Sequence, residues 1–228
     1  MTKQDPRLAA LRLSGRAIDS LNMANLLRHE NRSLMVETSE NSAIISGADI
    51  VISWRCEGRC RADHESAIEF SIDSDSRLPY DAIGCLAYDL GNDPKQQHRI
   101  RPILVGPDGI SKKISIPFLR PLSKNERFSV LVTSALPGCM RYGIDYYTAT
   151  FSFSQPEAVR CIIHLVFLDE RPAWVRVYDQ DASGRVTELG DLRPTSVHAK
   201  KTEYREVMPN ASPRSARVYL FERHEGTP

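Results

Sequence analysis

The sequence predicts a mainly β protein: an antiparallel β-sandwich, immunoglobulin-like or jelly-roll-like, with one amphipathic helix at its N-terminus. After residue 31, short segments rich in Val, Ile, Phe, Tyr and Thr recur between turn-forming sequences. Many of these segments alternate apolar and polar residues, which is typical of antiparallel sheets with one buried face. No helical pattern lies between them, so we do not expect a parallel sheet, whose strands need crossover helices.

The composition is that of an ordinary globular protein. Of the 228 residues, 41% are hydrophobic and 26% are charged, which excludes collagen, coiled coils and disordered polyelectrolytes. The net charge of +1 and the 7% aromatic content argue against nucleic-acid binding, and Tyr146 and Tyr147 would face opposite sides of one strand rather than form a stacking platform. The longest apolar run, 161–168, is far shorter than the roughly 20 residues of a membrane span.

Residues 8–28 carry the helical pattern. Apolar residues recur there near helical spacing, namely Leu13, Ala17, Leu21, Ala24 and Leu27. Such a stripe is the ordinary way in which a helix packs on a core, and it also suits a partner or membrane surface. We therefore expect residues 1–30 to form a helix that docks on the sandwich or projects from it.

The strands follow from the alternation and from the turns that separate them. They are expected at 33–38, 42–46, 50–55, 67–72, 82–88, 100–105, 112–116, 127–133, 146–153, 160–168, 173–178, 198–206 and 215–221. Turns at 106–109, 136–138 and 181–184 contain Pro or Gly in positions that suit them. We expect residues 31–194 to form the sandwich core, and strands in 195–228 to complete it or to reach a partner.

The cysteines suggest both a compartment and a metal site. There are five, an odd number, with no apolar leader before them, so we expect a reducing compartment and a cytoplasmic protein. Cys56, Cys60 and His64 lie at intervals of four residues, and Asp63 or Glu65 would give a zinc ion its fourth ligand. A disulfide between Cys56 and Cys60, or a hairpin loop without metal, explains the same pattern.

Residues 73–101 are the densest in functional residue types. The candidate binding residues are Tyr80, Asp81, Asp89, His98, Arg99 and Arg101. The basic members would meet an acidic partner or a phosphate, or they would pair with nearby aspartates at the rim of one sheet. The alternating acids at 73 and 75 resemble part of a calcium loop, but the later Gly and Glu of such a loop are missing.

Catalytic signatures such as G-x-S-x-G, a phosphate loop or H-E-x-x-H are absent from the sequence. We therefore expect a non-enzymatic recognition or assembly module without a cofactor. It would bind another protein, or a second copy of itself, through sandwich edges, loops or the N-terminal helix. The alternative is a hydrolase or ligand-modifying enzyme that uses Asp81, Asp89 and His98, or Cys139 in its turn. A zinc-dependent switch at Cys56, Cys60 and His64 is a third hypothesis.

Overall fold

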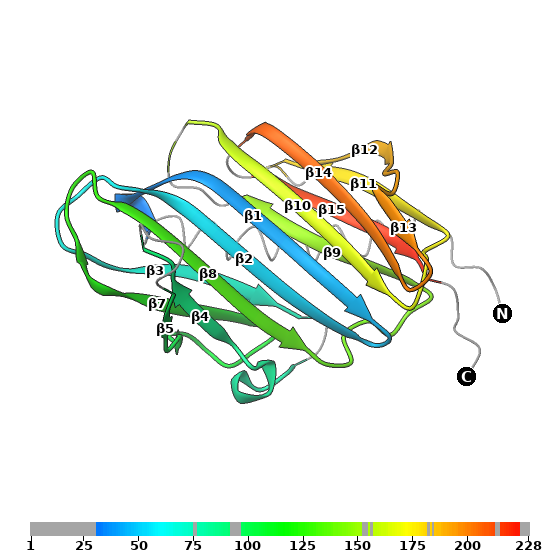
Figure 1. Cartoon of the computed structure of the whole chain (residues 1–228), viewed down its shortest axis with the longest axis horizontal. Coiled ribbons are helices and arrows are strands. Elements are labelled where there is room, and N and C mark those ends of the chain that lie inside the picture. The colour runs from blue at the N-terminus through cyan, green and yellow to red at the C-terminus, as the bar shows by residue number, and fades with distance from the viewer. Residues whose placement is uncertain are drawn as a thin grey trace.

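A computed structural model describes residues 31–74, 77–91, 97–151, 155, 157–181, 183, 185–212 and 215–223. These residues form a mainly β fold with three sheets (Figure 1). The helix expected within residues 1–30 lies outside them. The described part of the chain contains no helix with the length and apolar character needed to cross a membrane.

The largest sheet has eight strands in the order β13-β14-β10-β1-β2-β8-β4-β5. They are β1 (Leu34–Ser46), β2 (Asp49–Cys60), β4 (Leu86–Asp89), β5 (His98–Ile100), β8 (Arg127–Leu136), β10 (Val159–Leu168), β13 (Ser196–His198) and β14 (Lys201–Ala211). The four-stranded sheet has the order β12-β11-β15-β9, with β9 (Ile144–Phe151), β11 (Trp174–Gln180), β12 (Val186–Asp191) and β15 (Ser215–Glu222). The three-stranded sheet has the order β3-β7-β6, with β3 (Glu65–Asp73), β6 (Ile103–Leu104) and β7 (Ser111–Leu122). The short 3-10 helices are η1 (Asn31–Ser33) and η2 (Tyr80–Ile83).

The three sheets share one core. A single buried cluster includes side chains from the large sheet, such as Ile45 and Val130, and from both small sheets, such as Ile116 and Phe151. In Figure 1 the large sheet crosses the front, with the three-stranded sheet at the left and the four-stranded sheet at the right. The strands after residue 194 belong to these sheets, because β14 pairs with β10, and β15 pairs with β11 and β9.

One pairing differs from the antiparallel expectation. Strands β1 and β10 run parallel, from Thr38 opposite Arg160 to Ser46 opposite Leu168. Strand β10 is buried along nearly its whole length, and such continuous apolar runs are typical of parallel strands covered on both faces. More than a hundred residues separate β1 from β10, so no crossover helix is needed between them.

Several expected strand boundaries are also wrong. The segment 100–105 includes the end of β5 and the separate strand β6, and the segment 198–206 includes the turn between β13 and β14. The segments 33–38 and 42–46 are one continuous strand, β1, because β2 and β10 pair with it on both sides through its polar middle. The segment 82–88 instead begins within η2, and only Leu86–Asp89 is extended. Polar residues in a central strand and a Pro-led 3-10 turn both defeat a prediction based on alternation.

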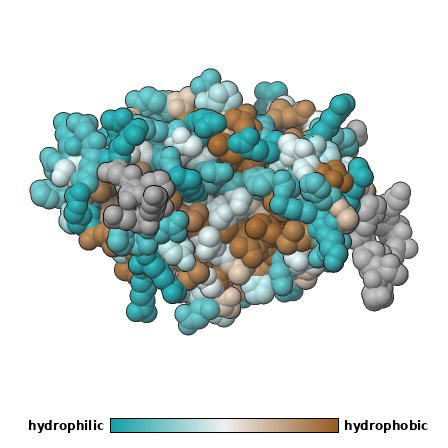
Figure 2. Space-filling view, viewed as in Figure 1, coloured by the Kyte–Doolittle hydropathy of each residue, from teal (hydrophilic) through white to brown (hydrophobic). Residues whose placement is uncertain are grey.

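The face of the molecule turned toward the reader in Figure 2 is mostly hydrophilic, with hydrophobic residues in separate patches. On strands of the large sheet, Ile44, Val51 and Val207 are 38%, 40% and 42% exposed. Single apolar side chains at a surface are ordinary in globular proteins and do not by themselves mark a binding site. The space between the sheets is the more distinctive feature of the molecule.

Candidate binding cavity between the three sheets

A cavity of about 560 Å³ lies between the sheets, within the range of about 300–1,000 Å³ of small-ligand pockets. We call it the inter-sheet cavity. The floor comes from β2 and β8 of the large sheet, with the side chains of Ile50, Ile52, Trp54, Val132 and Leu136. The floor is mainly apolar because these residues belong to the core-facing side of two alternating strands, and Ser134 adds one hydroxyl group between Val132 and Leu136.

Two edge strands form its walls. Every residue from Ile68 to Asp73 of β3 and every residue from Asp145 to Thr150 of β9 lines the cavity. Successive side chains of a strand point to opposite faces, so an unbroken run of lining residues means that the strand borders the cavity along its edge. Strand β3 is the last strand of the three-stranded sheet, and β9 is the last strand of the four-stranded sheet.

The walls add polar and acidic groups to the apolar floor. The acidic residues Glu69, Asp73 and Asp145 are among those that line the cavity. Glu69 Oε2 and Thr148 Oγ1 are buried without a hydrogen-bond partner in the described part of the chain. An unsatisfied buried polar atom costs about 1–3 kcal/mol, so a ligand that supplies a donor to these atoms would recover that cost.

Aromatic packing fixes the floor at its β3 side. The rings of Trp54 and Phe70 stack with centroids 5.8 Å apart. The indole nitrogen of Trp54 donates a hydrogen bond to Ser39 Oγ at 3.0 Å. Both ends of the Trp54 side chain are therefore held, and the indole presents a rigid apolar surface to the cavity.

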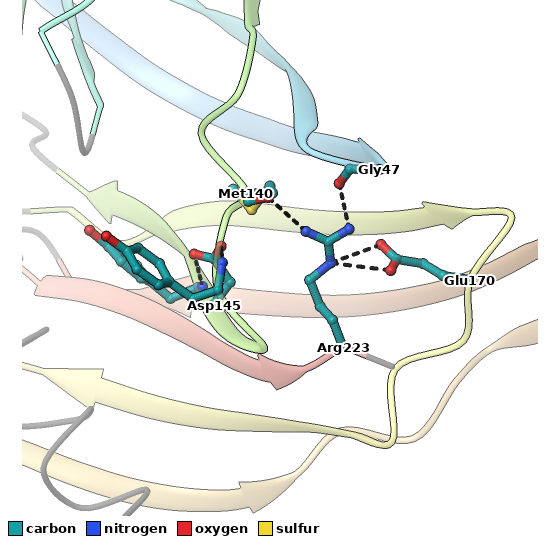
Figure 3. Close-up of polar contacts among 7 residues, drawn as sticks. Gly47, Met140, Asp145, Glu170 and Arg223 are labelled. Carbon is teal, nitrogen blue, oxygen red and sulfur yellow. Dashed lines mark hydrogen bonds and ion pairs between the residues drawn. The ribbon is translucent and has the colours of Figure 1, made fainter. Parts of the chain in front are cut away.

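Arg223 joins three segments near one end of the cavity, and Figure 3 shows its contacts with Gly47, Met140 and Glu170. Arg223 follows β15 and donates from Nη1 to the Met140 carbonyl at 2.9 Å and from Nη2 to the Gly47 carbonyl. Its Nε lies 3.1 Å from a carboxylate oxygen of Glu170, and the two side chains are only 13% and 14% exposed. Met140 lines the cavity, as does the nearby Asp145. Arg223 is thus a positioning residue for this wall.

The predicted zinc residues are spread along one strand and the turn after it. Cys56 and Cys60 lie on β2 and are fully buried, and His64 is in the following turn with a left-handed φ of 66°. Four residues of extended strand span roughly 13 Å. Both cysteines are free thiols, and across that distance they cannot form the disulfide that their spacing in the sequence suggested. The described residues contain no group of three or more His, Cys, Asp or Glu placed to hold a metal ion.

Buried thiols predict a loss of stability in alkali. Burial raises the pKa of Cys161 from 9.0 to about 12 and raises that of Cys56 as well. Above about pH 9 a thiol ionises in the unfolded chain while the folded chain keeps its proton, so stability present below that pH is lost as pH rises. Between about pH 8 and about pH 10, Cys161 alone should cost about 1.4 kcal/mol.

Urea unfolding of the reduced protein at those two pH values checks this expectation. The Cys161→Ala variant should show a smaller loss of unfolding free energy across the interval than the wild type. Equal losses in the two proteins would contradict a protonated, buried Cys161.

Part of the predicted binding cluster gathers at the outer edge of the large sheet. Asp89 of β4 lies opposite His98 of β5, and Tyr88 lies opposite Arg99. His98 and Arg99 are exposed. Asp89 Oδ1 accepts a hydrogen bond from the Gly91 N–H at 2.8 Å.

The other three predicted residues lie on η2 and after β5. Asp81 and Arg101 are exposed. Tyr80 is held by the fold, because its N–H donates to Asp108 Oδ2 and its hydroxyl donates to the Pro102 carbonyl, both at 3.0 Å. None of the six predicted binding residues lines the inter-sheet cavity.

Sequence reasoning missed the cavity residues for one main reason. Alternation identified the strands that contain Phe70 and Ala149, but not which strands lie at the edges of their sheets. Tyr146 and Tyr147 both line the cavity, although they point to opposite faces of β9, because β9 borders the cavity along its edge. The available signal was the mostly polar segment 145–150.

No protein-family model and no curated protein matches the sequence. Similar solved structures include a mutant of the M1 zinc metallopeptidase from Deinococcus radiodurans, alone and bound to a Tyr-Ser-Ala substrate. Each match has a TM-score of 0.50 and 10% identity, and covers 82% of this chain and 42% of the other. The chain therefore spans less than half the length of these structures, and the likeness is one of fold.

Proposed function

We propose that this chain is a non-catalytic, cytoplasmic recognition module that binds a segment of another protein in the inter-sheet cavity. The observation that carries the proposal is the cavity itself, with an apolar floor and two edge strands as walls. In this proposal the three sheets act as a β-sandwich, the large sheet forming one layer and the small sheets the other. Burial of apolar surface on the floor supplies affinity, and the carboxylates of the wall select for a cationic ligand.

A cavity-filling substitution tests the proposal. Ile52 lies on the floor and is only partly buried, so Ile52→Trp should fill the cavity while the fold survives. We expect the full-length wild type to retain a stoichiometric protein partner from native cells at low and moderate salt. Ile52→Trp should lose at least about nine-tenths of that partner, which requires a loss of affinity of more than about 10-fold.

Leu119→Trp is the matched control, because Leu119 is 57% exposed and lies outside the cavity. It should retain the partner at the wild-type level. A partner lost equally from both variants, or retained by both, would contradict binding in the cavity. Thermal unfolding of both variants verifies that they fold.

Hydrolysis is the alternative function. The similar structures are those of a zinc metallopeptidase, and in this chain Asp89 faces His98 across β4 and β5. If this edge were catalytic, Asp89→Asn and His98→Ala would abolish turnover in folded protein. In the proposed module the same variants should retain the partner unchanged. Stoichiometric zinc that is lost on Cys56→Ser would instead favour the metal switch.

A further inference from the structure

We propose that the ligand is a short extended peptide segment that adds as a β-strand between β3 and β9, an inference that rests on the proposed recognition function. The segment would place apolar side chains over the cavity floor and a Lys or Arg beside Glu69. Backbone hydrogen bonds would come from both walls. Three features of the described residues support this geometry.

The first feature is the edge of β3 that faces away from β7. The side-chain amide of Asn31 donates to the Glu69 carbonyl at 2.6 Å and accepts from the Glu69 N–H at 2.8 Å. Asn31 thus imitates a neighbouring strand at one position. Backbone N–H and C=O groups alternate in direction along a strand. The N–H and C=O groups of the odd-numbered residues of β3 therefore point away from β7. Pro117, which cannot donate, lies opposite Ala67, as this alternation requires. Ser71 then presents its N–H and C=O to the cavity.

The second feature is the edge of β9 that faces away from β15. The backbone N–H of Arg223 donates to the Gly143 carbonyl at 2.7 Å. The backbone N–H and C=O groups of the odd-numbered residues of β9 therefore point toward β15. The backbone N–H and C=O groups of the even-numbered residues of β9 therefore point into the cavity. The Tyr146 N–H is already bonded to Asp145 Oδ1 at 3.0 Å. Thr148 and Thr150 are the next two residues that present backbone groups there.

An added strand satisfies both edges at once. Neighbouring strands lie about 4.8 Å apart, so the proposal requires β3 and β9 to lie about 9.6 Å apart on the two sides of the segment. The segment would then join the two small sheets into one continuous sheet. Main-chain hydrogen bonds supply affinity in strand addition, and alternate side chains supply specificity. The open positions at Ser71, Thr148 and Thr150 limit the paired stretch to a few residues.

The third feature is charge. Side chains of Ile68, Phe70 and Ile72 point into the core, so Glu69 and Asp73 lie on the opposite face of β3. An added strand would therefore have an apolar face over Ile52 and Trp54 and a second face beside these carboxylates. Glu69 Oε2 is buried without a partner in the described part of the chain, and a Lys or Arg donor is the group that best satisfies it.

Fluorescence anisotropy with the full-length chain tests the proposal. The probe is a labelled peptide of about nine residues that alternates threonine and valine around a central lysine. We expect the lysine peptide to bind at least about 10-fold more tightly than its central-glutamate counterpart, and at least about 10-fold more tightly than a version with alternate amides N-methylated. Glu69→Gln should remove the preference for lysine over glutamate, whereas Leu119→Trp should preserve both preferences.

Absence of binding, or equal binding by the N-methylated peptide, would overturn strand addition. This failure differs from failure of the proposed function. If Ile52→Trp loses the cellular partner while N-methylation has no effect, recognition in the cavity stands and strand addition is wrong. If Ile52→Trp retains the partner, the recognition function itself is wrong.

Discussion

Gly58→Ala is expected to lower the free energy of unfolding by about 3 kcal/mol or more. A Cβ atom at this position would lie 1.9 Å from the carbonyl oxygen of Met35. That oxygen belongs to the backbone, so no rotamer change relieves the overlap. Strand β1 or β2 must therefore move, and both are central strands of the large sheet.

The close approach at Gly58 has a local cause. The register between β1 and β2 is irregular between Val36 and Thr38. The buried side chain of Gln155 accepts a hydrogen bond from the Val36 N–H at 2.8 Å and donates to the Val36 carbonyl. Val36 lines the inter-sheet cavity. A shift at Gly58 would consequently distort the cavity as well as destabilise the sheet.

Gly143→Ala is the matched control for this substitution. A Cβ atom at Gly143 meets nothing within 4 Å, so we expect a change below about 1 kcal/mol. Urea unfolding followed by circular dichroism measures both variants. If Gly58→Ala unfolds within about 1 kcal/mol of the wild type, the described approach of β1 to β2 is wrong.

Arg223→Ala is expected to cost about 3–5 kcal/mol of unfolding free energy. The substitution leaves the Glu170 carboxylate, only 14% exposed, without its cation. The carbonyls of Met140 and Gly47 lose their donors at the same time. Arg223→Lys should recover only part of the loss, because an ammonium group cannot reproduce the planar fork of the guanidinium.

An exposed arginine gives the contrast. Arg120 pairs with Glu126 but is 68% exposed, so Arg120→Ala should cost at most about 1 kcal/mol. Arg223→Ala combined with Glu170→Ala should be more stable than Arg223→Ala alone, since no buried carboxylate is left unpaired. Equal small losses for Arg223→Ala and Arg120→Ala in urea unfolding would contradict the anchoring role of Arg223.

Much of the fold could be predicted because most strands have one buried face. Phe128, Val130 and Val132 share the buried side of β8, as their alternation indicates. The parallel pairing of β10 could not be predicted, because strand order depends on contacts between segments that are distant in sequence. The same limitation hid the contact of Asn31 with Glu69, two residues on different elements.

The candidate site was harder to predict than the fold. A cavity between sheets depends on which strand edges remain unpaired, and residue spacing carries no such information. Asp89 of β4 and His98 of β5 occupy paired positions, and a binding role for them stays a prediction. Cys56 and Cys60 are close in sequence but lie along an extended strand, so their spacing does not bring the thiols together.

Amide hydrogen exchange of the full chain with and without the central-lysine peptide tests the central claim most directly. Binding between β3 and β9 predicts at least about 10-fold slower exchange for the Ser71, Thr148 and Thr150 amides in the complex. The amides of β5 should exchange at the same rate in both states. Protection confined to β5, or unchanged exchange along both β3 and β9, would contradict recognition in the inter-sheet cavity.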